Sequence, residues 1–469
     1  MHAFNSKLSG EEMTVEGYEH VKKVWKKFQC NNLLDYSLLY LLMDVGLLAD
    51  VYMSWRNATY EQFGIDPVHY LTSTSLSLDA FLYSSKVRLP LISDGELYQL
   101  ITSNSLVNRR ATASNPYVNP HFKDHDKQTY ILYVDFASLY PTTMAEYKMP
   151  LDVITELTPP ELEEFTKSDI ESINPQEEYG YFILLDTKQM RDDVARDTDA
   201  FPLALHPMNI GKEHVSQYTR NLLKKFNTKI PKKNVKLVGT HLPMKNHLIC
   251  LPLLQTLMKL GLEIESIKKV YKFRQDTYLR DYIMQNAAQR ARESDPDKRN
   301  TIKILMNGLF GGTIKNSLNY ANRNVVVASE DSLFRNVSKH TYKSLDMINE
   351  ERFIINHHRE TVLADSPIYI GFSVLDFAKD KMYKFYYNVL RAHYRDRVQL
   401  LYMDTDSFFF TLETEDLMSE LKGPLHPHMD FSNFPKSHPL HDSSRKGDLG
   451  LLKIETGSEY IRSSSRVKT

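Results

Sequence analysis

The tetrapeptide Asp404-Thr405-Asp406-Ser407 places two carboxylates one residue apart, between the apolar runs 400–403 and 408–410. These flanking runs are short and rich in aromatic residues, so they predict two β-strands joined by a tight turn. Residues at i and i+2 point to the same side of a strand, and two like charges that close repel unless a cation lies between them. Carboxylate oxygens suit Mg²⁺ or Mn²⁺. Because Asp, Thr and Ser are also common in ordinary turns, this stretch alone leaves a plain turn and a metal site open.

A third acidic residue lies near the end of another apolar run. Residues 130–136 read Tyr-Ile-Leu-Tyr-Val-Asp-Phe, which predicts a buried strand that carries Asp135 close to its end. A carboxylate in such a place costs free energy unless it is paired or binds a metal. We therefore expect Asp135 to have a function.

A cation and an amide share one face of a predicted helix upstream of the two acids. Lys303, Asn307 and Phe310 follow the spacing i, i+4 and i+7. Gly308 and Gly311 allow a backbone or a ligand to approach closely. This combination suits a triphosphate, whereas a plain helix C-terminus with glycine caps is the alternative.

Composition limits the class of protein that holds these groups. The chain has 469 residues, of which 42% are hydrophobic and 25% charged, as in a soluble globular protein of two to four domains. The net charge of -1 excludes a basic field over the whole surface, so a nucleic-acid surface would have to be local. Cys30 and Cys250, far apart in the sequence, argue against a disulfide framework and favour a reducing compartment.

No membrane or secretory segment is expected. The N-terminus lacks an apolar signal region, and no uninterrupted apolar run approaches the roughly 18 residues that span a bilayer. We expect an intracellular protein of the nucleus or cytoplasm, or one associated with a virion.

The spacing of apolar residues indicates the elements that position the candidate residues. Residues 21–56 are predicted to be mostly helical, and Tyr40 and Asp44 share a face of this helix at i and i+4. An exposed acid on an amphipathic helix is the simpler interpretation of this pair. A helix is also predicted at 251–260, a strand at 264–273 and a basic helix at 276–292, with short strands at 325–328 and 369–374.

Four further stretches are less regular or carry particular side chains. The predicted helix 376–394 carries several aromatic residues that we expect beneath the sheet, and the last stretch of about 55 residues is expected to be mostly loop. Residues 100–115 include Arg109 and Arg110, which could contact phosphate or lie in a solvated loop. Residues 151–245 contain a basic cluster that could face a nucleic acid strand or be a solvated surface. That cluster consists of Lys224, Lys225, Lys229, Lys232, Lys233 and Lys236.

Three motifs in this order resemble those of family B DNA polymerases. Residues 135–141, Asp-Phe-Ala-Ser-Leu-Tyr-Pro, are similar to motif A, Dx2SLYP. Residues 303–311 resemble motif B, KxxxNSxYG, and residues 402–407 resemble motif C, YxDTDS. The long interval between motifs A and B resembles the protein-primed branch, as found in adenoviruses, linear plasmids and self-synthesising DNA transposons. Tyr40 and Asp44 resemble the YxxxD exonuclease motif of the transposon branch.

The resemblance covers nearly the whole chain, from about Tyr18 to Glu455, and implies an α+β fold. It implies a right-hand polymerase palm and fingers with an antiparallel palm sheet, a partial exonuclease-like N-terminal region and a largely missing thumb, so that the chain is truncated at both ends. The implied domains are an exonuclease remnant and linker at 1–115, palm at 116–150, an inserted terminal-protein-region-like module at 151–245, fingers at 246–324, palm at 325–430 and the start of a thumb at 431–469.

The resemblance also implies roles for single residues. Asp135 and Asp406 are implied as metal ligands, Asp404 as a supporting carboxylate, and Lys303 as a cation that binds the triphosphate and donates a proton to pyrophosphate. The implied nucleotide-binding residues are Ser138, Leu139, Tyr140, Lys303, Asn307, Arg290 and Arg292, with either arginine open as the second phosphate-binding cation. Those implied at the primer or template are Tyr402, Thr405, Gly308 and Gly311.

Motif B departs from the family at Gly308, where Ser is usual, and at Phe310, where Tyr is usual. Without these two hydroxyls, hydrogen bonding in the nucleotide pocket should be weaker by about 1 kcal/mol for each hydroxyl. Because Asp44 has no partner acids from the other exonuclease motifs, we expect the 3′–5′ exonuclease activity to be lost.

The function implied is template-directed DNA synthesis by a DNA-directed DNA polymerase that transfers a dNTP to a primer 3′-hydroxyl with two Mg²⁺ ions, or with Mn²⁺. The implied partners are template-primer DNA, dNTPs and a terminal priming protein, with no membrane. The alternative is a non-catalytic polymerase remnant that only binds nucleic acid. A metal-dependent glycosyltransferase would also use Asp404 and Asp406, but it would not need motifs A and B.

Overall fold

The computed structural model describes residues 4–5, 10–105, 111–113, 117–118, 128–232, 234–317, 322–361, 363–456 and 464–465. The chain divides into two compact units, residues 1–69 and 70–469, which are described separately. Arg109 and Arg110, which could contact phosphate or lie in a solvated loop, are outside the described residues.

The first unit is helical, as predicted. It consists of α1 (Val15–Lys27), α2 (Leu33–Phe63) and the 3-10 helix η2 (Pro67–His69). Asn32 caps α2 because its side chain accepts a hydrogen bond from the backbone N–H of Asp35. Gly64 adopts the left-handed conformation that ends this helix, with φ of 68°.

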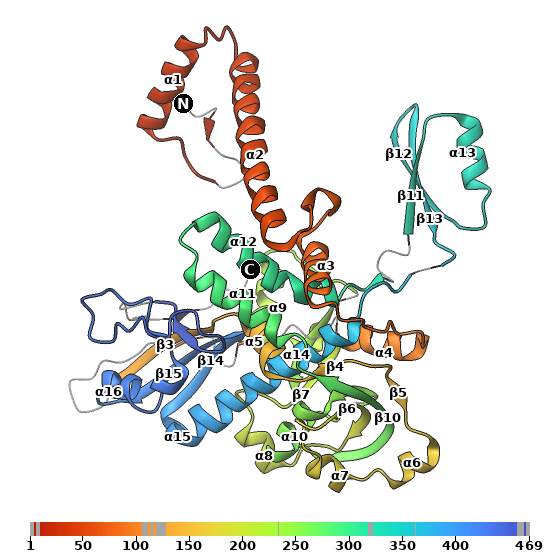
Figure 1. The fold of residues 1–469 in the computed structure, drawn as a ribbon, viewed down its shortest axis with the longest axis vertical. Coiled ribbons are helices and arrows are strands. Elements are labelled where there is room, and N and C mark those ends of the chain that lie inside the picture. The colour runs from red at the N-terminus through yellow and green to blue at the C-terminus, as the bar shows by residue number, and fades with distance from the viewer. Residues whose placement is uncertain are drawn as a thin grey trace. The chain divides into compact units, whose positions relative to one another are not determined.

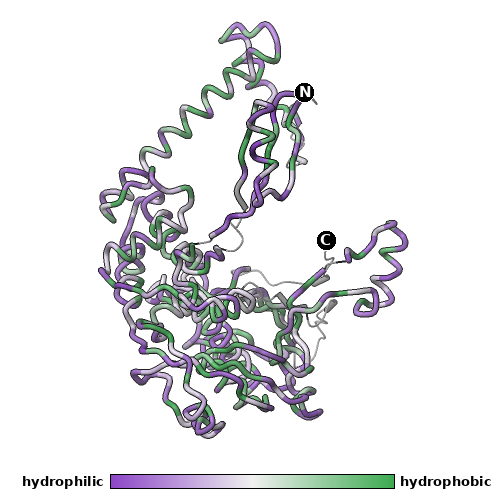
Figure 2. The backbone as a smooth tube through the Cα atoms, turned by 90° about the vertical axis from the view of Figure 1, so that its right-hand side faces the viewer, coloured by the Kyte–Doolittle hydropathy of each residue, from purple (hydrophilic) through white to green (hydrophobic). Residues whose placement is uncertain are grey.

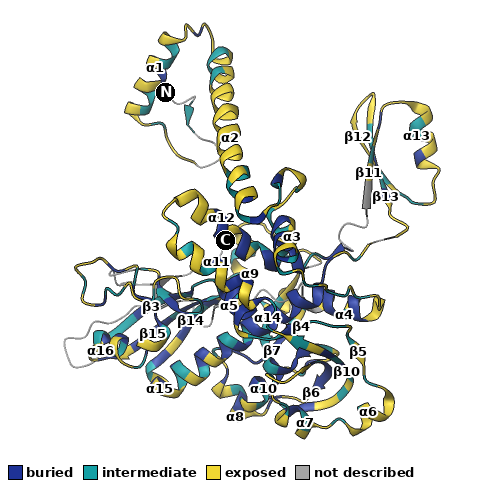
Figure 3. Ribbon diagram, in the orientation of Figure 1, coloured by how far each residue is buried: buried dark blue, intermediate teal, exposed yellow. Residues whose placement is uncertain are grey.

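Helix α2 is apolar on most of its surface and exposed along most of its length (Figure 3). Figure 2, coloured by hydropathy, likewise shows green apolar residues in the N-terminal unit as well as in the larger unit. Within the described residues, α2 is long and apolar enough to cross a membrane. The uninterrupted apolar runs of the sequence predict no such segment. Isolated Asp residues interrupt the apolar sequence of α2, so no single run within it is long enough. Core helices of soluble proteins can have the same length and composition, so this finding by itself does not assign α2 to a membrane.

The second unit contains an antiparallel sheet that carries the two acidic motifs (Figure 1). Its strand order is β1-β14-β15-β3-β16. The strands are β1 (Ala111–Ala113), β3 (Gln128–Phe136), β14 (Val398–Asp404), β15 (Ser407–Thr414) and β16 (Leu452–Ile454). The strand predicted to end near Asp135 and the hairpin predicted around Asp404 and Asp406 are both confirmed.

Aromatic side chains of one long helical segment pack against this sheet, as the sequence predicts. The segment consists of α14 (Ile368–Tyr383), a π-helix (Lys384–Arg391), α15 (Ala392–Tyr394) and the 3-10 helix η6 (Arg395–Arg397). Phe385 lies against both Phe136 of β3 and Phe408 of β15, with ring centroids 5.8 and 5.6 Å apart. Figure 3 shows α14 and the central strands largely in the colour of buried residues.

The strand predicted at 369–374 is wrong, because these residues form the first turns of α14. The side chains from Ile368 to Ala378 are all buried, so polar and apolar positions do not alternate and the helix has no polar face that the sequence could reveal. A short apolar run of this kind does not distinguish a strand from a buried helix.

A second antiparallel sheet has the strand order β4-β10-β6-β9, with β5 also paired to β10. Its strands are β4 (Met149–Pro150), β5 (Thr155–Glu156), β6 (Tyr179–Thr187), β9 (His247–Cys250) and β10 (Ile264–Asp276). The predicted helix, strand and helix are confirmed as α10 (Leu251–Lys259), β10 and α11 (Arg280–Arg292). In this sheet β6, which precedes residue 245, pairs with β9 and β10, which follow it. The domain limits predicted from the sequence stay a prediction.

The remaining elements form smaller groups. β11 (Asn322–Val327), β13 (Arg352–His358) and β12 (Tyr342–Asn349) form an antiparallel sheet beside α13 (Glu330–Val337) (Figure 1). The sequence indicated only the first of these strands. The other elements are β2 (Tyr117–Val118) paired with β17 (Ser464–Ser465), β7 (Ala204–Asn209) paired with β8 (Val235–Thr240), α4 (Gly95–Ser105), α6 (Pro159–Glu164), α7 (Lys167–Ser172), α8 (Asp192–Asp197), η3 (Lys212–His214), α9 (Gln217–Lys225), α16 (Leu417–Lys422) and η7 (His426–His428).

Four helices pack together next to the central sheet: α3 (Ser73–Ser85), α5 (Leu139–Glu146), α11 and α12 (Pro296–Thr313). α5 follows β3 directly, and α12 carries the residues of motif B. The chain thereby brings motif A, motif B and motif C into one region of the second unit.

Candidate active site

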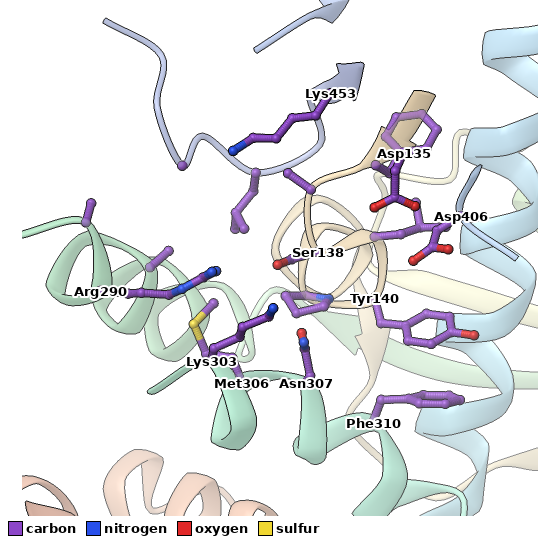
Figure 4. A pocket seen from close by; sticks show the side chains of 18 of the residues that line it. Asp135, Ser138, Tyr140, Arg290, Lys303, Met306, Asn307, Phe310, Asp406 and Lys453 are labelled. Carbon is purple, nitrogen blue, oxygen red and sulfur yellow. The ribbon is translucent and has the colours of Figure 1, made fainter. Parts of the chain in front are cut away.

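The carboxyl groups of Asp135 and Asp406 lie side by side at the end of the central sheet (Figure 4). β3 and β15 are antiparallel neighbours, with Asp135 opposite Ser407. The backbone N–H of Phe136 donates to the backbone carbonyl of Asp406 at 2.9 Å, which fixes the turn of the hairpin against the end of β3. Thr405 has a left-handed backbone with φ of 55°, so the chain reverses between the two acids of motif C.

Burial and neighbouring negative charge raise the pKa of both carboxyl groups. Burial, together with the negative charges of Asp406 and Glu455, raises the pKa of Asp135 to about 7, while Lys303 opposes this effect. Burial also raises the pKa of Asp406. Because the two carboxyl groups lie next to each other, the negative charge of Asp406 favours the protonated form of Asp135. A divalent cation could replace that proton, because it would remove the same repulsion.

Asp404 has a different surrounding from Asp406. Its carboxylate accepts hydrogen bonds from the hydroxyls of Tyr402 at 2.9 Å and of Thr405 at 3.0 Å. Asp406 lines the cavity, whereas Asp404 is exposed and outside its lining. The negative charge of Asp404 nevertheless raises the pKa of Asp406. Tyr402 and Thr405 thus hold Asp404 next to the acid that faces the cavity.

Cations from α11 and α12 line the opposite wall of this cavity, whose volume is about 750 Å³. Lys303 and Arg290 extend toward the space in front of the two acids, and Asn307 lies next to Lys303 (Figure 4). Burial lowers the pKa of Arg290, and the nearby charge of Arg299 lowers it further. A site with carboxylates on one side and clustered cations on the other suits a polyanion that also carries a metal.

Helix α5 forms the floor between the two walls. Ser138 precedes it in a left-handed conformation, with φ of 58° and ψ of 59°, and Leu139 is buried at its first position. Ser138, Leu139 and Tyr140 all line the cavity. The ring of Tyr140 stacks on the ring of Phe310 at a centroid distance of 4.2 Å (Figure 4).

The two glycines of motif B are in contact with α3. A Cβ on Gly308 would lie 2.5 Å from the hydroxyl of Ser77, and one on Gly311 would lie 2.6 Å from the methyl group of Thr74. Gly311 also lines the cavity, whereas Gly308 does not. The close approach of α12 and α3 therefore explains why residue 308 is glycine. The implied contact of Gly308 with primer or template stays a prediction.

Three cations of the cavity were missed in the sequence: Arg299, Lys446 and Lys453. Arg299 lies one helical turn before Lys303, so its spacing could have indicated it. Lys453 lies on β16 directly opposite Asp135, and its ammonium group is 3.3 Å from the carboxylate of the buried Asp430. No local pattern indicates this position, since it depends on the pairing of β16 with β3.

Other implied residues lie elsewhere. Arg292 lines a separate shallow hollow, so of the two candidate arginines only Arg290 lines the cavity.

Tyr40 and Asp44 are exposed on α2 in the first unit. In the described part of the chain, His, Cys, Asp and Glu residues form no group of three or more that could hold a metal ion. The loss of exonuclease activity stays a prediction.

Comparison with known proteins identifies the family. Residues 7–389 match the model of the family described as DNA polymerase type B, organellar and viral. The chain therefore belongs to this family of type B DNA polymerases.

Two known proteins illustrate the relationship. A DNA polymerase of Kluyveromyces lactis is 22% identical over 413 residues, which are 87% of this chain and 36% of that protein. The structure of phi29 DNA polymerase complexed with primer-template DNA has a similar fold, with a TM-score of 0.52, 14% identity, and coverage of 93% of this chain and 62% of that one. The chain thus spans about a third of the one relative and less than two thirds of the other. The expected partial right-hand polymerase fold of mixed helices and antiparallel sheets is confirmed.

Proposed function

We propose that this chain catalyses template-directed DNA synthesis, in which the 3′-hydroxyl of a primer attacks the α-phosphorus of a dNTP and pyrophosphate leaves. The observation that carries the proposal is one cavity in which Asp135 and Asp406 face Lys303. The similarity to polymerases that bind primer-template DNA supports DNA and dNTPs as the substrates. In this proposal the template base selects the incoming nucleotide, because base pairing distinguishes the four dNTPs.

The carboxyl pair fits a pair of Mg²⁺ ions. Mg²⁺ is commonly held by one or two protein carboxylates together with substrate phosphates. The raised pKa of Asp135 reflects its burial and its repulsion by Asp406, which a cation would relieve. Asp135 and Asp406 would hold the metal, and bound Mg²⁺ would neutralise the charge that develops on the reacting phosphate oxygens. Asp404 would support Asp406 through its charge and through its bonds to Tyr402 and Thr405.

The cations on the opposite wall would bind the rest of the triphosphate. Lys303 is exposed and lines the cavity, so it would neutralise the leaving pyrophosphate and give it a proton. Arg290 would be the second phosphate-binding cation, because it lines the same cavity and Arg292 does not. Helix α5 begins at Leu139, and the positive end of its dipole would favour phosphate oxygens in the cavity.

The stacked rings would select the sugar. Phe310 supports the ring of Tyr140 from below. A ring held in this way leaves no room for the 2′-oxygen of a ribonucleotide beneath the sugar, so dNTPs would be preferred. We further propose a terminal priming protein as the partner that supplies the first hydroxyl, because the long interval between motifs A and B resembles that of protein-primed polymerases.

Primer extension by the purified chain tests the function. A primed template with dNTPs and Mg²⁺ should be extended, and Asp406→Asn should lower the rate by at least about a thousandfold, since it removes charge where the transition state needs it. Asp396→Asn, which removes a fully exposed carboxylate outside the cavity lining, is the matched control and should extend normally. No extension by the wild-type chain would instead favour a non-catalytic remnant that binds nucleic acid.

A further inference from the structure

The segment from Lys212 to Lys236 differs in charge from the rest of the chain. It contains eight Lys and Arg residues and a single carboxylate, Glu213, in a protein whose net charge is -1. Glu213 pairs with the neighbouring His214 at 3.1 Å. In the described part of this segment, the lysines and Arg220 form no ion pair with a carboxylate, and Lys233 lies outside the described residues. This basic segment, residues 212–236, therefore has a local positive field that the neutral chain as a whole lacks.

The structure shows how the fold holds this segment on the surface. Strands β7 and β8 pair with each other, and the chain between them forms η3 and α9. Asn234 closes the excursion, because its backbone N–H donates to the side chain of Asn209 at 2.8 Å and its amide group donates to the carbonyl of Ile210 at 3.3 Å. The described part of the segment thus lies mostly between two paired strands, and it shares no residue with the active-site cavity.

Helix α9 directs its cations to one side. Arg220 and Lys224 are one turn apart, Lys225 follows, and α9 contains no Asp or Glu. The same exposed side carries an amide pair, in which Gln217 donates to Asn221 at 3.0 Å. Lys224 and Lys225 in the last turn also stabilise the helix dipole, but this local effect does not explain Arg220 or the lysines beyond the helix.

Two aromatic rings at the two ends of α9 are strongly exposed. Tyr218 is 72% and Phe226 67% exposed, and the ammonium group of Lys225 lies 5.7 Å from the centroid of the Phe226 ring. Exposed rings among cations are the combination by which proteins hold single strands, since the rings stack on bases and the cations bind phosphates. An acidic protein partner would match the charge but would leave the exposed rings unexplained.

We propose that the basic segment is a binding site for single-stranded nucleic acid, separate from the active-site cavity. Arg220, Lys224, Lys225 and Lys229 contact backbone phosphates, and Tyr218 and Phe226 stack on bases. The site takes a flexible single strand without sequence preference, because every base offers a ring face and the phosphates repeat.

Binding of a fluorescein-labelled oligo-dT 20-mer to the full chain, measured by anisotropy over a series of salt concentrations, tests this site. Replacing Lys224, Lys225 and Lys229 by Gln should weaken binding and lower the slope of log K against log salt by about two, because each lost phosphate contact on a single strand contributes about 0.7. Phe226→Ala should weaken binding by about fivefold or more. Replacing Lys22, Lys23 and Lys26 of α1 by Gln removes the same charge elsewhere and should leave the slope unchanged. Equal slopes for both triple variants would overturn the proposal.

A second measurement does not depend on the folding of the charge variants. A photo-crosslinking amino acid at position 226 of the otherwise wild-type chain should form a covalent adduct with the oligonucleotide, whereas the same group at the exposed Val153 should not. Equal crosslinking at both positions, or none at 226, contradicts the site. Competition by poly-glutamate as strong as that by unlabelled oligo-dT of equal charge would assign the segment to an acidic protein and reject the nucleic acid.

Discussion

The ring of Phe310 stacks on the ring of Tyr140, with centroids 4.2 Å apart and an interplanar angle of 28°. The pair joins α12 to α5, and thus motif B to motif A, within the cavity that holds Asp135 and Asp406. Phe310 has no hydroxyl, so its support of Tyr140 comes from the ring contact alone. An aromatic pair of this kind contributes about 0.5–1.5 kcal/mol beyond the burial of its surface.

Removing this stacking should weaken the selection of the sugar. Phe310→Leu keeps an apolar side chain but loses the ring, so the ratio of kcat/KM for dNTP to that for NTP should fall by about two- to tenfold. Phe310→Tyr retains the ring and should retain the ratio. Single-nucleotide incorporation measures the ratio for both variants. An unchanged ratio in Phe310→Leu would show that Tyr140 selects the sugar without support from Phe310.

The raised pKa of Asp135 predicts the pH dependence of the metal-free chain. The pKa of Asp135 is raised to about 7, so between about pH 4 and pH 7 the folded chain binds a proton that the unfolded chain has released. The unfolding free energy should therefore fall as the pH rises through this window. Asp135→Asn cannot ionise, and in EDTA at pH 8 it should have a higher Tm than the wild type. The two proteins should differ less at pH 5, and a constant difference at both pH values would show that the proton is not held as described.

The two arginines of α11 should differ in their effect on the nucleotide. Arg290 lines the cavity and Arg292 lies in a separate hollow. Losing a charge-assisted contact to phosphate costs about 1.5–3 kcal/mol, so Arg290→Ala should raise the KM for dNTP by roughly ten- to hundredfold. Arg292→Ala removes the same charge two residues away, on a different side of α11, and should change KM by less than about threefold. Titration of dNTP in the extension assay measures KM for each variant. Equal changes in KM for the two substitutions would mean that the phosphates bind outside this cavity.

The contact between α12 and α3 should not tolerate a methyl group at Gly312. A Cβ there would lie 2.6 Å from the backbone carbonyl oxygen of Thr74, which cannot move aside as a flexible side chain can. Gly312→Ala should therefore lower the unfolding free energy by about 1–3 kcal/mol. Gly46 in α2 has open space around it, so Gly46→Ala should be neutral or slightly stabilising. Thermal unfolding of both variants measures the difference, and a stable Gly312→Ala chain would mean that the two helices can separate.

Local sequence determined the elements that carry the chemistry. The apolar run before Asp135, the hairpin around Asp404 and Asp406, and the helical spacing of Lys303 and Asn307 are all present as predicted. These signals are local because strand pattern, turn residues and helical period depend on neighbouring residues. The sequence also indicated the family through the order of its three motifs. The match over residues 7–389, which ends before motif C, confirms the family.

Only the tertiary structure decided which side chains share the site. Pairing of β15 with β3 sets Asp406 beside Asp135, and pairing of β16 with β3 adds Lys453 from the far end of the chain. The choice of Arg290 over Arg292 and the role of Gly308 against α3 likewise depend on how helices pack. The helix at 368–383 was misread as a strand at its start because burial on all sides removes the polar face that marks a helix. Contacts between distant segments leave no periodic trace in a single sequence, so these features follow from the fold alone.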